Sequence, residues 1–151
     1  MGEFNEQVPI LNSILKNGGD YIMSINKTAI VQKFFQLAGE GKWDEVEPFL
    51  HPDFEVIPAT CQPYAGAYRG LRGFQEIVHK IYNETYELYE PTVLEFTEGP
   101  HTVVVLISVK VTGKKTGQTI TMDLVEALRF EEGKIRSIVP YYFDTKLLVE
   151  L

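Results

Sequence analysis

One carboxyl group lies in a segment whose neighbouring side chains are hydrocarbons. Residues alternate between two faces in the strand expected at 118–130, so Glu126 shares a face with Met122, Leu124 and Leu128. Burial raises the pKa of a carboxyl group, which suits a proton donor or a base near neutral pH. Because an unpaired buried carboxylate is costly, the alternative is that Glu126 lies near an open edge, or pairs with a cation or hydroxyl and only holds strands together.

Two tyrosines are expected near this carboxyl group. Tyr142 shares a face with Ile138 in the last expected strand, and Tyr82 lies beside Val78 on the longest expected helix. Buried tyrosine hydroxyls usually find a hydrogen-bond partner, so Tyr82, Tyr142 and Glu126 together could orient a ligand oxygen and form a catalytic cluster. The alternative for each tyrosine is an amphipathic core residue whose hydroxyl group reaches water.

The segment 58–68 contains prolines, glycine and two tyrosines without helical or strand periodicity, which predicts a loop across the mouth of a pocket. Two of its aromatic side chains would contact a ligand there. The other ligand contacts are expected from the helices, the loop and the inner face of the sheet. The predicted ligand-binding residues are Tyr68, Tyr64, Phe34, Ile57, Val78, Met122, Leu124 and Ile138.

The sequence contains no recognisable metal-binding or nucleophile motif. His51, His79 and His101 are not spaced as ligands on one helix or strand, and Cys61 has no histidine close to it in sequence. Cys61 also lacks a signature for a partner base. We therefore expect neither a metal ion nor a cofactor.

Composition and charge narrow the class of protein. A chain of 151 residues with 44% hydrophobic residues can form one substantial core but not two ordinary domains. A formal net charge of −7 disfavours nucleic acid and anionic membranes as partners. With a lone cysteine and neither a signal-peptide pattern nor a membrane-length apolar run, the sequence predicts a soluble, cytoplasmic protein.

Apolar periodicity predicts helices in the first half of the chain and a meander of strands in the second half. Short connections make consecutive strands antiparallel, and helices grouped before a meander are typical of an α+β fold. The expected helices are 28–37, 43–50 and 70–86, and the expected strands are 54–57, 91–98, 101–112, 118–130 and 134–143.

The first 22 residues differ from the rest. Ile10, Ile14 and nearby apolar residues (Val8, Leu11 and Leu15) have helical spacing that stops at the turn signal of residues 17–20, which is compatible with a docked helix. The segment that begins at Met23 resembles the natural N-terminus of a protein, with Ser24 or Asn26 available to cap the next helix. We predict an N-terminal extension at 1–22 and a single domain at 23–151.

A truncated chain that begins at Met23 is therefore expected to fold. Its solubility and its thermal melting should match those of the full chain, because the domain would keep its own core. An insoluble product, or a far lower melting temperature, would contradict this boundary.

Two sequence features carry a family resemblance. The phrase Tyr68-Arg69-Gly70 leads into the longest helix, and residues 123–135 read DLVEALRFEEGKI. In this order of elements, residues 24–151 resemble the superfamily of nuclear transport factor 2, ketosteroid isomerase and the SnoaL-like polyketide cyclases. The resemblance implies a cystatin-like, nuclear transport factor 2-like cone, in which a curved antiparallel sheet packs on about three helices and encloses a pocket.

The resemblance argues against steroid isomerisation by the usual groups. Ketosteroid isomerase uses an aspartate base together with a tyrosine and a protonated aspartate. On that pattern Phe34 replaces the tyrosine, Ile57 or Pro58 replaces the base, and Glu126 keeps the carboxyl group of the second aspartate. Hydrocarbon side chains cannot donate or accept the required protons.

The leading hypothesis is a small-molecule pocket protein, a cofactor-independent isomerase, cyclase or lyase that acts on an apolar oxygen-bearing compound. The alternative is a non-catalytic ligand-binding or dimerisation module. The apolar run 103–107 would be buried on both sides or covered by a partner, so we predict a homodimer through the outer face of the sheet. The sequence does not specify the substrate.

Overall fold

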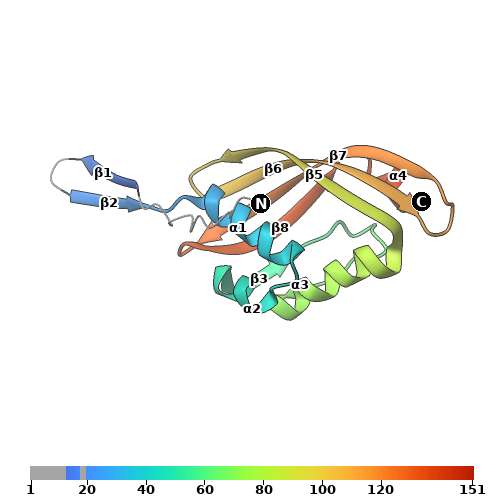
Figure 1. The fold of residues 1–151 in the computed structure, drawn as a ribbon, viewed down its shortest axis with the longest axis horizontal. Helices are drawn as coiled ribbons and strands as arrows, with labels where there is room; N and C mark the ends of the chain where they lie inside the picture. The colour runs from blue at the N-terminus through green and yellow to red at the C-terminus, as the bar shows by residue number, and fades with distance from the viewer. Residues whose placement is uncertain (1–12, 18–19) are drawn as a thin grey trace, which may run out of the picture.

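The computed structural model describes residues 13–17 and 20–151, with side chains from residue 25 onward. A curved six-stranded sheet in the order β4-β3-β8-β7-β6-β5 forms the body of the protein (Figure 1). Neighbouring strands are antiparallel except for the parallel pair β3 and β8. The strands are β3 (Leu50–Val56), β4 (Tyr68–Arg69), β5 (Tyr86–Glu98), β6 (Thr102–Gly113), β7 (Thr119–Glu131) and β8 (Lys134–Tyr142).

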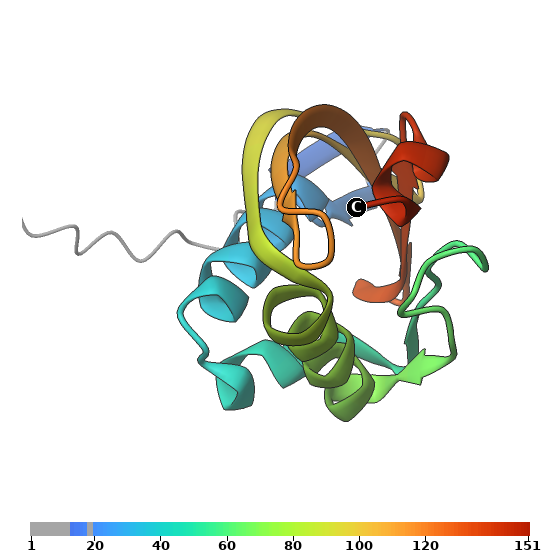
Figure 2. The same cartoon turned by 90° about the vertical axis from the view of Figure 1, so that its right-hand side faces the viewer.

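Helices cover the concave side of this sheet. Figure 2, a view along the strands, shows the first three helices on that side, opposite β6 and β7. The helices are α1 (Lys27–Gly39), α2 (Trp43–Val46), the 3₁₀ turn η1 (Glu47–Phe49), α3 (Gly70–His79), the π-helical turn η2 (Lys80–Thr85) and α4 (Thr145–Val149). The α+β class and the curved sheet on helices are confirmed. In the described part of the chain, no helix has both the length and the apolarity that crossing a membrane requires.

Helix α1 forms where its sequence predicts it. The side chain of Asn26 accepts a hydrogen bond of 2.9 Å from the backbone nitrogen of Ala29, which caps the first turn. Val31, Phe34 and Leu37 are buried along one face. The helix ends at a glycine-rich turn in which Gly41 has a φ of 69°, a conformation that favours glycine.

The second expected helix is shorter than its sequence pattern suggests. Helix α2 covers only Trp43–Val46, and after η1 the chain is already extended at Leu50. The segment His51-Pro52-Asp53, expected to end a helix, instead lies within β3. Proline is tolerated there because the pairing of β3 with β8 is irregular between Leu50 and Glu55.

The third expected helix has nearly the predicted length, with its last turns π-helical, and the strand after it begins early. The α-helix ends at His79, η2 follows, and β5 begins at Tyr86 rather than near residue 91. Pro91 does not interrupt β5, because β5 is an edge strand and one side of it needs no hydrogen-bond donor. This correction places Tyr86 and Tyr89 on the sheet.

The apolar run in β6 alternates between the two faces. Val103, Val105 and Ile107 are buried on the concave face, whereas Val104 and Leu106 remain partly exposed on the outer face. The run therefore contributes to the core and also leaves an apolar outer surface.

The described part of the N-terminal segment forms strands and not the expected helix. Strands β1 (Ser13–Asn17) and β2 (Asp20–Ser24) pair antiparallel as a hairpin that extends away from the main sheet (Figure 1). A two-residue glycine connection favours such a hairpin. Val8, Ile10 and Leu11 lie outside the described residues. Met23 pairs with Ile14 inside β2, and the domain boundary proposed there remains a prediction.

Helix α4 was not expected from the sequence. Asp144 caps it by accepting a hydrogen bond of 2.9 Å from the backbone nitrogen of Leu147. Leu148 and Leu151 are buried, and the carbonyl oxygen of Leu151 accepts a hydrogen bond of 3.0 Å from Thr116. This segment therefore covers one end of the core beside the β6–β7 turn.

Candidate functional site

A cavity of about 450 Å³ lies between the helices and the concave face of the sheet. This volume is within the range typical of small-molecule sites. Most of its wall is hydrocarbon or aromatic. The lining residues are Phe35, Ala38, Gly39, Trp43, Val56, Tyr64, Phe74, Ile77, Val78, Ile81, Tyr82, Tyr89, Pro91, Val93, Ile107, Leu124, Glu126, Ile138, Pro140 and Tyr142.

Glu126 is the single acidic residue of this wall, and the wall contains no lysine, arginine or histidine. It lies in the middle of the sheet, paired with Val105 on β6 and Pro140 on β8. Within residues 25–151 it forms neither a hydrogen bond nor an ion pair. Burial alone raises the pKa of its carboxyl group from 4.5 to about 7. Both protonation states are therefore accessible near neutral pH, as proton exchange requires.

Three tyrosines beside Glu126 form a hydrogen-bonded chain, which we call the tyrosine chain: Tyr64, Tyr142 and Tyr89. The hydroxyl group of Tyr64 donates to that of Tyr142 over 3.3 Å, and the hydroxyl groups of Tyr142 and Tyr89 are 2.8 Å apart. Burial is the main cause that raises the pKa of all three phenols. They therefore remain neutral hydrogen-bonding groups at physiological pH.

The curvature of the sheet makes this chain possible. Tyr142 is on β8 and Tyr89 is on β5, and two further strands separate them in the sheet. Adjacent strands lie about 4.8 Å apart, so a flat sheet would hold these two backbones about 14 Å apart. The 2.8 Å contact is therefore made across the concave face.

Glu126 is close to this chain. Its direct partner on β8 is Pro140, so Tyr142 is its diagonal neighbour on the same face. Such neighbours are about 7–8 Å apart at the backbone, which is within reach of long side chains. The carboxyl group and the hydroxyl groups can thus contact two atoms of one ligand.

Two further tyrosines surround Tyr89. Tyr82, on η2, packs edge-on against it at 5.3 Å between ring centroids, and Tyr86 stacks on it at 5.8 Å. Burial, and secondarily the Glu126 carboxylate, raises the pKa of Tyr82 to about 12. The hydroxyl group of Tyr86 is buried without a hydrogen-bond partner among the described residues.

Seven of the predicted site residues lie in the cavity wall. Glu126, Tyr142 and Tyr82, proposed as catalytic, converge there from two strands and a helical turn. The predicted ligand contacts that also line the cavity are Tyr64, Val78, Leu124 and Ile138.

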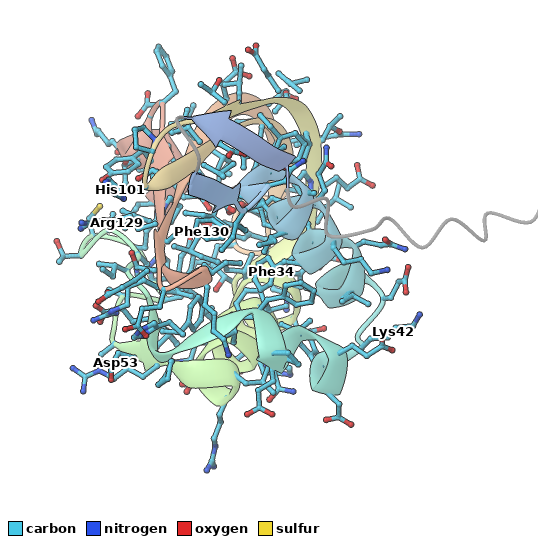
Figure 3. The ribbon with its side chains drawn as sticks, turned by 90° about the vertical axis from the view of Figure 1, so that its left-hand side faces the viewer. Phe34, Lys42, Asp53, His101, Arg129 and Phe130 are labelled. Atoms are coloured by element: carbon cyan, nitrogen blue, oxygen red, sulfur yellow. The ribbon has the colours of Figure 1, made fainter. Side chains whose placement is uncertain are left out.

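Four predicted ligand contacts do not line this cavity. Phe34 is fully buried in the core, and Figure 3 shows it in the interior, whereas Lys42 and Asp53 lie at the periphery. Tyr68 is buried, and its hydroxyl group donates to the carbonyl oxygen of Tyr64 over 2.7 Å. The other two are Ile57, which is exposed directly after the end of β3, and Met122, which is buried nearer the start of β7 than Glu126.

Several residues of the wall are not predicted by the sequence patterns. Tyr89 lies between the expected end of a helix at residue 86 and the expected start of a strand at residue 91. It is also three positions after Tyr86, a spacing that is typical of a helix and not of one face of a strand. Phe35 was not separated from Phe34, since both belong to one helical stripe. Trp43 and Phe74, which pack edge-on with 5.8 Å between ring centroids, have helical spacing in the sequence, which does not distinguish a core residue from one that faces a cavity.

No group of three or more histidine, cysteine, aspartate or glutamate side chains that could hold a metal ion occurs in the described ranges. Cys61 is a free, exposed cysteine. The ionisable side chains of the cavity wall are one carboxyl group and several phenols.

Comparisons with known proteins agree with this architecture. The profile of the SnoaL-like domain matches residues 31–138. No curated protein matches the sequence. A nuclear transport factor 2-like protein from Burkholderia xenovorans is 27% identical, with a TM-score of 0.69 over 82% of this chain and 92% of that chain.

Two further solved structures share the fold. A nuclear transport factor 2-like protein of unknown function from Burkholderia pseudomallei is 20% identical, with a TM-score of 0.71 over 85% of this chain and 98% of its own. A candidate SnoaL-like polyketide cyclase from Mesorhizobium loti is 22% identical, with a TM-score of 0.61 over 78% of this chain and 100% of its own. The family resemblance is confirmed, and the chain belongs to the SnoaL-like domain family.

Proposed function

We propose that this protein is a small-molecule pocket protein in which Glu126 exchanges a proton with an apolar, oxygen-bearing compound, as a cofactor-independent isomerase, cyclase or lyase. The observation that carries this proposal is a carboxyl group that has no partner among residues 25–151 and lies in a cavity of about 450 Å³ with a mainly apolar wall. A purely structural carboxyl group would be expected to have a cation or hydrogen-bond donor beside it.

The proton exchange can be written in balanced form. The Glu126 carboxylate takes a proton from a carbon next to a carbonyl group, and the electrons of that C–H bond form a C=C bond. The carbonyl π electrons move to the oxygen, where a tyrosine hydroxyl group stabilises the developing charge. Return of the proton to another atom gives an isomer. Attack of the enolate carbon on a second carbonyl carbon of the same molecule closes a ring, and the oxygen of that carbonyl takes the proton from Glu126. Expulsion of a group from the β carbon, which leaves with its bonding electrons and takes the proton from Glu126, gives loss of that group.

Catalysed exchange of carbon-bound hydrogen tests the proposal. The probe is 2-acetonaphthone in deuterated buffer, with loss of its methyl proton signal followed by NMR. The protein is expected to speed exchange about 100-fold over buffer, the lower end for a positioned general base. Glu126→Gln should abolish this increase, because the amide cannot accept the proton.

Glu95→Gln is the matched control, since Glu95 is exposed on β5 and outside the cavity wall. It should leave the exchange rate unchanged. Equal rates for the unmodified protein and the Glu126→Gln variant would contradict a catalytic role and favour the alternative, a non-catalytic ligand-binding or dimerisation module.

We also propose that a second copy of the chain covers the outer face of the sheet and that the protein acts in the cytoplasm. Val104, Leu106, Val125 and Tyr141 lie on this face and are all at least partly exposed. A partner would remove this apolar surface from water.

Light scattering should therefore give about twice the chain mass of 17.2 kDa at micromolar concentration. Leu106→Glu should reduce the mass to that of one chain, because it places a charge at the centre of the apolar face. A monodisperse monomer of the unmodified protein would contradict the homodimer.

A further inference from the structure

The tyrosine chain has one more proton than its own hydrogen bonds use. Each neutral phenol carries one O–H donor and can also accept. Three hydroxyl groups therefore supply three protons, and the two hydrogen bonds of the chain use two of them. Because Tyr64 donates to Tyr142, the remaining proton is on Tyr89 or Tyr142, depending on which of the two donates to the other.

That remaining proton belongs to a residue of the cavity wall in either case. Tyr89 and Tyr142 both line the wall, and no acceptor within residues 25–151 is hydrogen-bonded to it. A buried donor without an acceptor is unfavourable, so this end of the cavity is suited to an acceptor atom on a bound molecule.

The charge of the wall limits what can carry that acceptor atom. The described lining residues include no cationic side chain, and Glu126 carries the single carboxyl group among them. A bound carboxylate or phosphate would lose its water without gaining a counter-charge, and it would lie near a second acid. The net charge of −7 adds to this repulsion.

We propose that the tyrosine chain makes the cavity selective for uncharged ligands with a hydrogen-bond-accepting oxygen, and that the wall excludes carboxylates and phosphates of the same shape. The proposal rests on the function proposed above, because it names the substrate class of the same site. It also assigns Tyr89 a part in recognition, which its position in the sequence did not suggest.

The arrangement also sets the order of groups along the ligand. The acceptor oxygen lies at the Tyr89–Tyr142 pair, and Glu126 lies one diagonal step away on the sheet. A carbonyl oxygen and the hydrogen on the adjacent carbon can then face the hydroxyl pair and the carboxyl group, respectively. Saturated hydrocarbons of the same size would leave the hydroxyl proton unpaired.

Three probes of matched shape test this selectivity: 2-acetonaphthone, 2-ethylnaphthalene and 2-naphthoate. Binding is followed by quenching of Trp43, the single tryptophan of the chain, which lies in the cavity wall. Because a ketone is better hydrated than a hydrocarbon, the informative quantity is the ratio of the two dissociation constants and its change between variants.

The triple variant Tyr64→Phe/Tyr89→Phe/Tyr142→Phe removes every hydroxyl group of the tyrosine chain, because Tyr64 also lines the wall and would be left with a free proton if only its neighbours were replaced. Its affinity for 2-acetonaphthone relative to 2-ethylnaphthalene should fall about tenfold, the usual effect of one lost hydrogen bond to a buried acceptor. Tyr141→Phe is the control, since Tyr141 is adjacent in sequence, 60% exposed and on the opposite face.

Two measurements on the unmodified protein do not depend on how the variants fold. The carbonyl stretching frequency of bound 2-acetonaphthone should be lower than in an aprotic solvent, as expected for an accepted hydrogen bond. Binding of 2-naphthoate at about pH 8 should be at least about 100-fold weaker than binding of the ketone.

An unshifted carbonyl frequency, an unchanged affinity ratio in a triple variant that still binds 2-ethylnaphthalene, or tight binding of 2-naphthoate would each overturn the inference. These outcomes are distinct from failure of the proposed function. If the ketone binds selectively but its protons do not exchange, the proton-exchange function fails and the selectivity stands. If the methyl protons of the ketone exchange but the ketone is not bound selectively, the selectivity fails and the proton-exchange function stands.

Discussion

Replacing Glu126 with glutamine is expected to stabilise the protein at alkaline pH by up to about 3 kcal/mol. Burial holds the pKa of this carboxyl group at about 7 in the folded protein, against 4.5 in an exposed carboxyl group. At about 1.4 kcal/mol per pH unit, this difference corresponds to about 3 kcal/mol. Water that enters the cavity would reduce the value, so it is an upper figure.

The sign follows from proton linkage. The folded state holds the Glu126 proton more tightly than the unfolded state, so stability that is fully present below pH 4.5 is lost as the pH rises to about 7. Above that range the carboxyl group is ionised in both states, and the loss is complete. Glutamine keeps the shape of the side chain and has no charge to bury, so the variant should not lose stability in this window.

Denaturant unfolding at a series of pH values between 4 and 9 measures this effect. The free energies of unfolding of the unmodified protein and the Glu126→Gln variant should be similar near pH 4 and should separate progressively up to about pH 7.5. Glu95→Gln should follow the unmodified protein throughout, because its carboxyl group is exposed. Parallel curves for Glu126→Gln and the unmodified protein would show that this carboxyl group does not titrate abnormally.

Truncation of Phe34 should mainly lower stability, whereas truncation of its neighbour Phe35 should mainly change the cavity. Phe34 has no exposed surface and stacks on Phe74 with 5.1 Å between ring centroids, so Phe34→Ala should lower the free energy of unfolding by about 3–5 kcal/mol. Phe35 is only partly buried, and its ring faces the cavity. Phe35→Ala should cost less stability and should enlarge the cavity.

Two measurements separate these consequences. Denaturant unfolding reports the stability of each variant, and quenching of Trp43 by 2-ethylnaphthalene reports the affinity of the cavity. Phe35→Ala should weaken binding while the protein stays folded, because apolar contacts with the ligand are lost. Equal losses of stability in the two variants, with unchanged binding by Phe35→Ala, would contradict the assignment of Phe34 to the core and Phe35 to the wall.

Local patterns in the sequence were sufficient to predict the inward direction of several side chains. Glu126 and Leu124 alternate with outward residues in β7, and Tyr142 follows the same rule in β8. A strand has only two faces, and residues two positions apart share one of them, so apolar residues two positions away on either side identify the inner face. The capping residue and inner face of α1 were also predictable, because capping and helical spacing depend only on residues three or four positions away.

Helical spacing is less decisive than strand alternation. A buried stripe on a helix is wide, and Phe34 and Phe35 both fall within it. Which ring enters the core and which faces the cavity depends on how far α1 is rotated against the sheet. That rotation is set by packing against distant elements, such as the contact of Phe34 with Phe74.

The sequence by itself thus determined the α+β class, the family and the inward position of Glu126, because short-range periodicity and turn residues specify these. The tertiary structure alone decided the site around that carboxyl group. Tyr89 and Tyr142 are 53 positions apart in sequence and on strands that are not adjacent, and their 2.8 Å contact exists only because the sheet curves over the cavity. The curvature is a property of the whole sheet and its helices, so no local pattern could indicate that these hydroxyl groups meet beside Glu126.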